Sequence, residues 1–196
     1  MKDFVYLASQ SPRRKQLLEQ IGVRYELLLA TPDEDAESLE RVIPGEAPLT
    51  YVKRVTQLKL EAAVKRMQAR GLKPAPVLCA DTTVALGRVI LGKPENEQDA
   101  VRILKTLSGQ THRVLTAVAV ASGRRRLLSV SVSKVTFTPI KLSEIKAYVA
   151  SGEPFGKAGA YGVQGMAAAY ISDIQGSYTG IMGLPLFETS VLLKNI

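Results

Sequence analysis

The chain has 196 residues, of which 46% are hydrophobic and 22% charged, and its formal net charge is +8. These values are ordinary for a folded domain and exclude a disordered or a fibrous protein. The length predicts a single domain over residues 1–196 with one shared core. The positive charge favours an anionic partner, and by itself it leaves nucleotides, nucleic acids and acidic membranes open.

Two further features of the sequence indicate the cellular compartment. The apolar runs are far shorter than the ~20 residues that a membrane span requires, and the N-terminal stretch is too short and too polar for a secretory signal. Cys79 is the only cysteine, so no disulfide can form within the chain, which is typical of a reducing compartment. We therefore expect a cytoplasmic protein that does not cross a membrane.

Apolar periodicity, glycines and prolines predict strands and helices that are mixed along the chain. The expected strands cover 4–8, 25–30, 77–80, a short hairpin over 84–91, a long hairpin of 113–121 with 127–137, and 168–174. The expected helices cover 11–20, 49–70, 96–107, 143–150 and 186–193, and glycine-rich loops are expected over 152–165 and 176–185. This order predicts an α/β or α+β fold with a mixed sheet.

The segment from Ser9 to Arg14 lies where the first strand gives way to a helix. Ser11 and Pro12 suit the start of that helix, whose free N–H groups and positive dipole end point at the junction. Arg13 and Arg14 in the first turn are unfavourable there unless an anion is bound, so the segment can form a phosphate cradle. The alternative is that both arginines extend into solvent and bind nothing.

One lysine lies among apolar residues of a predicted helix, where burying a charge would be costly. Lys59 lies on the stripe formed by Val52, Val55, Ala62 and Ala63 on the predicted long helix. Its ammonium group either passes the edge of the core to reach water or enters a cleft that contains an anion.

Asp81 follows the predicted strand over 77–80, and the carboxyl ends of strands face the ligand crevice in open α/β sheets. It can bind a metal or accept a proton there, or it can simply cap a turn of the local backbone. Lys93 could supply positive charge opposite Asp81, although alone it would be interpreted as a surface residue.

The segment 157–165 contains three glycines and Gln164. Uracil and thymine present an acceptor, a donor and an acceptor along their pairing edge, and an amide can satisfy two adjacent groups. The segment can therefore hold a pyrimidine base, or it can be a flexible surface loop.

Other patterns exclude common chemistries. Gly87 to Lys93 has most of the spacing of a phosphate-binding Walker loop, but Pro94 stands where the magnesium-binding hydroxyl belongs, so the match is interpreted as chance. His112 is the only histidine, which excludes a histidine-rich zinc site, and we expect it to be structural or solvated. A metal must then rest on carboxylates such as Glu34 and Asp81, whose oxygen atoms suit magnesium or manganese.

Taken together, the motifs resemble the Maf family of nucleotide pyrophosphatases, in order and over nearly the whole chain. The matching segments are Ser9-x-Ser11-Pro12-Arg13-Arg14, Asp33-Glu34, Tyr51-Val52-x-Arg54-x4-Lys59, Ala80-Asp81-Thr82-x-Val84, Gly92-Lys93-Pro94, Leu107-Ser108-Gly109-Gln110-Thr111-His112, Gly159-Ala160-Tyr161-Gly162-x-Gln164-Gly165 and Gly183-Leu184-Pro185. The resemblance implies an α/β fold, a long mixed β-sheet flanked by helices in two lobes with a central cleft, similar to the inosine triphosphate pyrophosphatases. It also implies a cytoplasmic and often dimeric protein.

The resemblance also implies roles for individual residues. Asp81 is the implied proton acceptor for the attacking water, and with Glu34 it is an implied ligand of the divalent metal. The implied determinants of base specificity are Arg13, Thr82 and Gln164. The implied phosphate-binding residues are Ser9, Arg14, Lys59 and Lys93.

We therefore expect hydrolysis of dTTP and UTP to the monophosphate and pyrophosphate by metal-assisted attack of water on the α-phosphate. Residues 13, 82 and 164 resemble the thymine and uracil branch of the family. In the branch that resembles 7-methylguanosine triphosphate pyrophosphatases, those positions hold an aromatic residue, a glutamine and a glutamate. The alternative is a regulatory or nucleic-acid-binding protein linked to septum formation, which the basic excess and the turn Arg124–Arg126 suggest.

Overall fold

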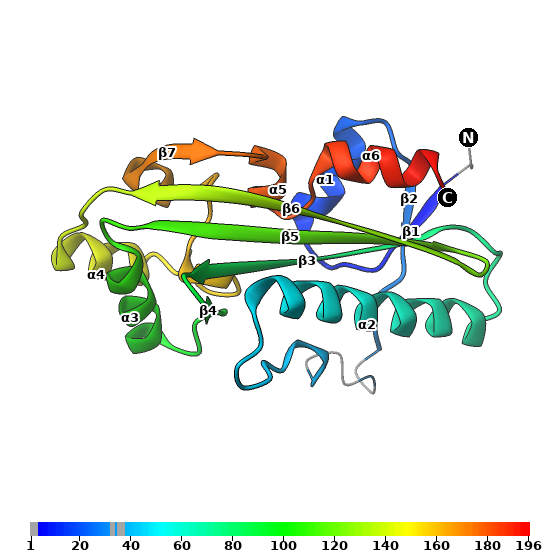
Figure 1. Cartoon of the computed structure of the whole chain (residues 1–196), viewed down its shortest axis with the longest axis horizontal. Helices are drawn as coiled ribbons and strands as arrows, with labels where there is room; N and C mark the ends of the chain where they lie inside the picture. Colours follow the sequence, from blue (N-terminus) through cyan, green and yellow to red (C-terminus); the bar gives the residue numbers. More distant parts are fainter. Residues whose placement is uncertain (1–3, 32–33, 35–37) are drawn as a thin grey trace.

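The computed structural model describes residues 4–31, 34 and 38–196. The described strands form one mixed sheet in the order β2-β1-β3-β5-β6-β7, with β4 paired to β3 (Figure 1). The strands are β1 (Val5–Leu7), β2 (Tyr25–Leu27), β3 (Val77–Leu86), β4 (Val89–Leu91), β5 (Thr111–Ser122), β6 (Arg125–Phe137) and β7 (Ile171–Gln175). The α-helices are α1 (Pro12–Gln20), α2 (Pro48–Ala69), α3 (Glu97–Leu107), α4 (Leu142–Ala150), α5 (Tyr178–Met182) and α6 (Leu186–Lys194). Three short 3₁₀ turns are η1 (Ser38–Glu40), η2 (Ala158–Ala160) and η3 (Met166–Tyr170).

The central strand β3 has two short neighbours on one edge and a long neighbour on the other. β5 pairs with β3 from Val77 to Ala85 in antiparallel register. On the opposite edge, β1 pairs only with Val77 and Leu78, and β4 pairs only from Val84 to Leu86. Among the described strands, none covers that edge of β3 from Cys79 to Thr83, so this stretch of backbone is open to a cleft.

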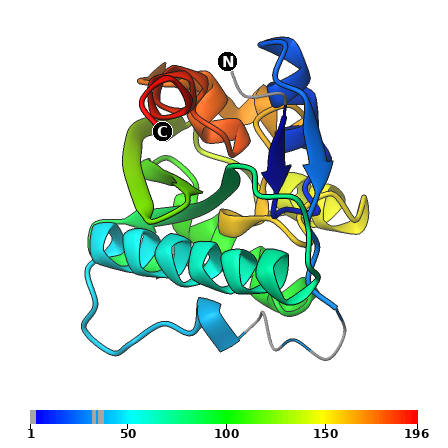
Figure 2. The ribbon, with the colours of Figure 1, turned by 90° about the vertical axis from the view of Figure 1, so that its right-hand side faces the viewer.

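Helices cover both faces of the sheet (Figure 2). The long helix α2 packs on one face, where Val52 and Val55 contact Leu115 and Ala117 of β5. The other face carries α1, α5 and α6, and its core continues through Leu17 and Leu18 of α1. Because successive side chains of a strand point to opposite faces, each residue of β3 is assigned to one of these two layers.

Local chemistry fixes several element ends. Pro12 stands in the first turn of α1, where the missing N–H costs nothing. Asn96 caps α3 by accepting a hydrogen bond from the Asp99 N–H at 2.9 Å. Gly123, in the tight turn between β5 and β6, has a φ of +55°, a conformation that favours glycine.

The structure confirms the mixed sheet flanked by helices and corrects several boundaries. The strand expected to end at Ala80 continues through Asp81 to Leu86, because residues 81–85 pair with β5 and residues 84–86 pair with β4. The expected second strand ends at Leu27 rather than at residue 30, and the last strand begins at Ile171 rather than at residue 168. Both loops expected to be irregular contain short helical turns, η2 and α5. No described helix is long and apolar enough to span a bilayer.

His112 is structural rather than solvated, with only 1% of its surface exposed. Its Nε2 atom lies 2.8 Å from the Tyr161 hydroxyl, and its ring packs edge-on against Phe137. Burial lowers the pKa of His112 to about 4. The neutral ring therefore helps to hold the loop around Tyr161 against β5.

This buried ring predicts a pH-dependent stability. The pKa of His112 is about 4 in the folded state against 6.5 in the unfolded chain. The unfolded state therefore binds more protons between these values, so the contribution is fully present above pH 6.5 and is lost as the pH falls towards 4. We expect the free energy of unfolding to fall by about 2 kcal/mol between pH 7 and pH 5 through this one group. Urea unfolding at the two pH values should show a correspondingly smaller loss in His112→Phe, and an equal loss in both proteins would contradict the assignment.

Candidate active site

A cavity of about 1100 Å³ lies along the open edge of β3, between the part of the molecule that carries α1 and α2 and the part that carries β4 and η2. Its lining brings together nearly all of the residues that the sequence singled out. These are Ser9, Arg13, Arg14, Glu34, Lys59, Asp81, Thr82 and Lys93. The lining combines six basic side chains with three carboxylates, Glu40 being the third. Such a cavity is suited to a polyanion.

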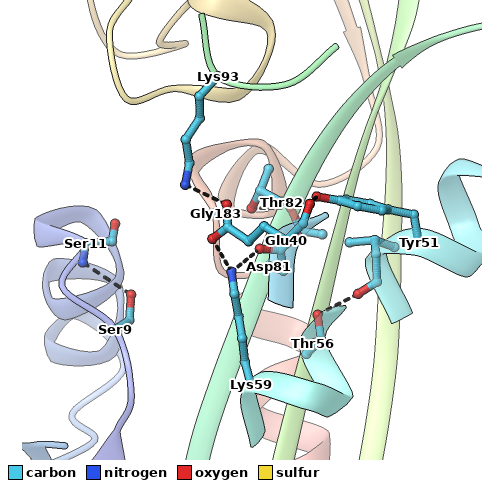
Figure 3. Close-up of polar contacts among 12 residues, drawn as sticks. Ser9, Ser11, Glu40, Tyr51, Thr56, Lys59, Asp81, Thr82, Lys93 and Gly183 are labelled. Carbon is cyan, nitrogen blue, oxygen red and sulfur yellow. Dashed lines mark hydrogen bonds and ion pairs between the residues drawn. The ribbon is translucent and has the colours of Figure 1, made fainter. Parts of the chain in front are cut away.

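The centre of the cavity is a chain of alternating charges (Figure 3). The Lys59 ammonium donates to Asp81 Oδ1 at 2.6 Å and to Glu40 Oε1 at 2.7 Å. The other oxygen of Glu40 accepts from Lys93 Nζ at 2.8 Å. Glu40 therefore links a lysine of α2 to a lysine that follows β4 across the cleft.

Lys59 reaches an anion rather than water. Tyr51, Val52 and Val55 fix α2 against β3 and β5, and Lys59 lies one turn further along the helix. Its side chain is 21% exposed, while that of Asp81 is only 11% exposed. A carboxylate this deep is costly unless an opposite charge accompanies it, and Lys59 supplies that charge.

Glu40 is a site residue that the sequence analysis did not single out. The structure fixes its backbone by a hydrogen bond of 2.8 Å from the Tyr51 hydroxyl to the Glu40 carbonyl oxygen. Burial raises the pKa of its side chain, but Lys59 and Lys93 outweigh that effect and lower the pKa to about 2. Glu40 is therefore an anion at neutral pH. No local pattern marks this residue, because Tyr51 is 11 positions away and the two lysines are 19 and 53 positions away.

The two arginines at the start of α1 behave differently. Arg14 does not extend into solvent: its Nε donates to the Gly183 carbonyl at 2.8 Å and its Nη1 donates to Ser9 Oγ at 3.1 Å. Burial lowers the pKa of Arg14, and the nearby Asp81 carboxylate opposes that shift. Arg13 lines the cavity, close to the Gly162 loop. The junction therefore brings both arginines to the cavity, and their role as a phosphate cradle stays a prediction.

Gln164 and Glu34 are the two predicted site residues whose side chains do not point freely into the cavity. Thr82 lines the cavity, but the Gln164 side chain is exposed and lies outside the lining, although Gly162 and Val163 belong to it. Glu34 lines the cavity while its carboxylate is bound by Arg66, with Nη2 to Oε2 at 2.5 Å. The hydrogen bonds from Arg66 lower the pKa of Glu34 to about 2. Asp33, which shares its motif, lies outside the described residues.

The donor set fits a cation that the substrate helps to hold. Asp81 and Glu40 converge on one ammonium, so both direct oxygen atoms to the same small volume. Magnesium is commonly bound by one or two carboxylates together with phosphate oxygens. In the described part of the chain, no group of three or more His, Cys, Asp and Glu side chains could enclose an ion alone. A role for Glu34 as the second ligand stays a prediction, and Glu40 is an additional candidate.

The fold and the cavity define a protein with a site suited to a polyanion at the open edge of a strand. Comparison with known proteins shows the family to which it belongs. The chain matches the family model "Maf-like protein" over residues 4–196 and belongs to the Maf family. A relative from Polaromonas sp. (strain JS666 / ATCC BAA-500), named dTTP/UTP pyrophosphatase, is 66% identical over 98% of this chain and 95% of its own length. A relative of the same name from Albidiferax ferrireducens is 63% identical over 100% of this chain and 98% of its own length. The solved Staphylococcus aureus Ham1 protein aligns with 69% of this chain and 72% of its own at 13% identity, with a TM-score of 0.47.

The charge chain predicts that Glu40 competes with anions for its two lysines. Glu40→Gln keeps the shape of the side chain and removes the charge that an anion must displace. We expect inorganic pyrophosphate to bind the variant roughly three- to tenfold more tightly than the wild type, because each partly exposed ion pair contributes about 0.2–1 kcal/mol. Titration calorimetry in the presence of a chelator measures this. Glu61→Gln, which breaks a pair with Arg126, is the matched control, and weaker binding by Glu40→Gln would contradict the expectation.

Proposed function

We propose that this chain is a nucleoside triphosphate pyrophosphatase that hydrolyses dTTP and UTP to the monophosphate and pyrophosphate. The observation that carries the proposal is the cavity at the open edge of β3, where Asp81 lies 2.6 Å from the Lys59 ammonium. Arg14 and Lys93 line the same cavity. Two relatives that are 66% and 63% identical over nearly the whole chain are named for this activity.

Asp81 is the proposed proton acceptor. Lys59 occupies its Oδ1 atom, and no hydrogen bond to Oδ2 comes from the described part of the protein. A water at Oδ2 attacks the α-phosphorus while Asp81 takes one of its protons. A bond forms between the water oxygen and the α-phosphorus, the bond to the oxygen that bridges to the β-phosphate breaks, and pyrophosphate leaves.

Lys59, Lys93 and Arg14 stabilise the negative charge that develops on the phosphates. In the substrate-free arrangement Glu40 holds Lys59 and Lys93 at 2.7 and 2.8 Å. The triphosphate takes the place of the Glu40 carboxylate on one or both lysines. Because the lysines are already held near their working positions, little further ordering of these side chains is needed on binding.

A divalent cation, magnesium or manganese, is part of the proposal. Asp81 would hold it with either Glu34 or Glu40, and when bound it would neutralise phosphate charge and favour release of pyrophosphate. The chain offers carboxylates for this purpose and has neither a second histidine nor a second cysteine. Oxygen ligands favour these hard cations over zinc.

Arg13, Thr82 and Gln164 are the proposed determinants of base choice. Val84, Val114 and Met182 line the cavity on the same side as Thr82 and offer apolar walls for a planar base. Gln164 reaches a base only if its loop shifts inward, since its side chain is exposed.

We place the enzyme in the cytoplasm, where its substrates occur, and a homodimer stays a prediction. The alternative of a nucleic-acid-binding regulator gains no support from the basic turn between β5 and β6. Arg126 of that turn donates to Glu61 of α2 at 2.6 Å, so part of the local charge is neutralised within the protein. No other described feature favours that alternative.

A substrate panel tests the proposal. The wild type should release pyrophosphate and a monophosphate from dTTP and UTP, and Asp81→Asn should lower the rate by about 10²–10⁴ because a positioned proton acceptor is lost. Asp173→Asn, on the exposed strand β7, is the control and should keep full activity. Product analysis by chromatography and a thermal melt of each variant give the readout. Near-normal turnover by folded Asp81→Asn would remove Asp81 from the mechanism.

The metal requirement has its own test. After dialysis against a chelator, we expect activity to vanish and to return with magnesium or manganese but not with zinc alone. Initial rates over a titration of each metal measure this. Full activity in an excess of chelator would refute the metal assignment.

A further inference from the structure

Two threonine hydroxyls on neighbouring strands form a short chain behind the cavity. Thr82 of β3 and Thr116 of β5 are direct partners in the strand register, and their Oγ1 atoms lie 3.0 Å apart. Thr116 Oγ1 also lies 2.7 Å from the carbonyl oxygen of Gly180 in α5. Thr116 is completely buried, so water cannot take part in this arrangement.

Counting protons fixes the direction of both hydrogen bonds. A carbonyl oxygen can only accept, so the single hydroxyl proton of Thr116 is donated to Gly180. Thr116 then has no proton left for its second contact, and the hydroxyl of Thr82 must be the donor there. The Thr82 oxygen therefore presents only lone pairs to the cavity. It can accept a hydrogen bond from a ligand but cannot donate one.

Two valines beside Thr82 offer the apolar surface that a planar base requires. Val84 lies on the same face of β3 as Thr82, paired with Val114 of β5, and both line the cavity. A Cβ at Gly183 would lie 3.6 Å from the Thr82 oxygen and 3.7 Å from Arg14 Nε, so the glycine avoids crowding between these two groups. The Arg14 Nε atom donates to the Gly183 carbonyl oxygen. An oxygen that only accepts would repel a phosphate and attract an N–H group.

We propose that Thr116 is a positioning residue that makes Thr82 an obligatory acceptor, and that Thr82 thereby selects bases that carry a hydrogen on N3. Thymine and uracil donate from N3, whereas cytosine presents a lone pair at that position. Cytosine would place two acceptors against each other and leave both unpaired, which is a strong basis for discrimination. This inference rests on the proposed function and adds the reason for its choice between pyrimidines.

The main test compares Thr116→Val with Thr116→Ser. The valine variant removes the buried hydroxyl and frees the Thr82 proton to point into the cavity, while the serine variant keeps the chain of hydrogen bonds. We expect the ratio of kcat/KM for dTTP over dCTP to fall about tenfold in Thr116→Val and to stay within about twofold in Thr116→Ser. A purely structural role for Thr116 would lower both substrates equally and leave the ratio unchanged, which would overturn the proposal.

Two further measurements distinguish base selection by Thr82 from a contact of Thr82 with the sugar and from a folding defect. Thr82→Val leaves the Thr116 bond to Gly180 intact and should lower the same ratio, so the test survives even if Thr116→Val does not fold. In the wild type, 3′-deoxythymidine triphosphate should be hydrolysed within a few-fold of dTTP. A large loss with that analogue, absent in Thr82→Val, would assign Thr82 to the sugar hydroxyl and overturn the proposal. A wild type that cleaves no nucleoside triphosphate would instead refute the proposed function itself.

Discussion

The ammonium group of Lys59 lies between the carboxylates of Asp81 and Glu40, and the charge of the whole cleft depends on this arrangement. Two carboxylates so close together would repel each other and raise the cost of burying Asp81. The lysine offsets that cost, and it does so only because α2 is fixed in register over β3 by Val52 and Val55. The apolar packing of one helix therefore determines the electrostatics of the site.

The uncovered edge of β3 is where these charged side chains meet the cleft. β1 and β4 each cover a few residues of β3, and the uncovered stretch between them includes Asp81 and Thr82. Successive residues of a strand point to opposite faces, so these two neighbours serve different sides of the cavity. Asp81 faces the lysine of α2, and Thr82 faces the apolar layer that includes Val84. Under the proposed function, one strand therefore carries the proton acceptor on one face and a base-selecting hydroxyl on the other.

The residues that were hardest to interpret in the sequence are polar side chains inside apolar strands. Asp81 and the threonines after it suggested the end of a strand, but β3 continues because each of them pairs with β5. Thr116 lies within the apolar run of β5, where a single threonine is an ordinary strand residue and marks no site. Its importance depends on the carbonyl of Gly180, which lies 64 positions away in the chain. Local propensity carries no information about such a partner.

The mixed sheet, its long helices and the family motifs could be predicted from the sequence, because these follow from local periodicity, turn residues and the order of short motifs. The same periodicity showed that Lys59 interrupts an apolar stripe, but it left open whether water or an anion receives the charge. The packing of α2 on the sheet answers that question, and the tertiary contacts also give Glu40 its two lysines and Arg14 its bond to Gly183. These contacts join segments distant in the chain, and their geometry is set by how helices pack on the sheet rather than by any pattern within one segment.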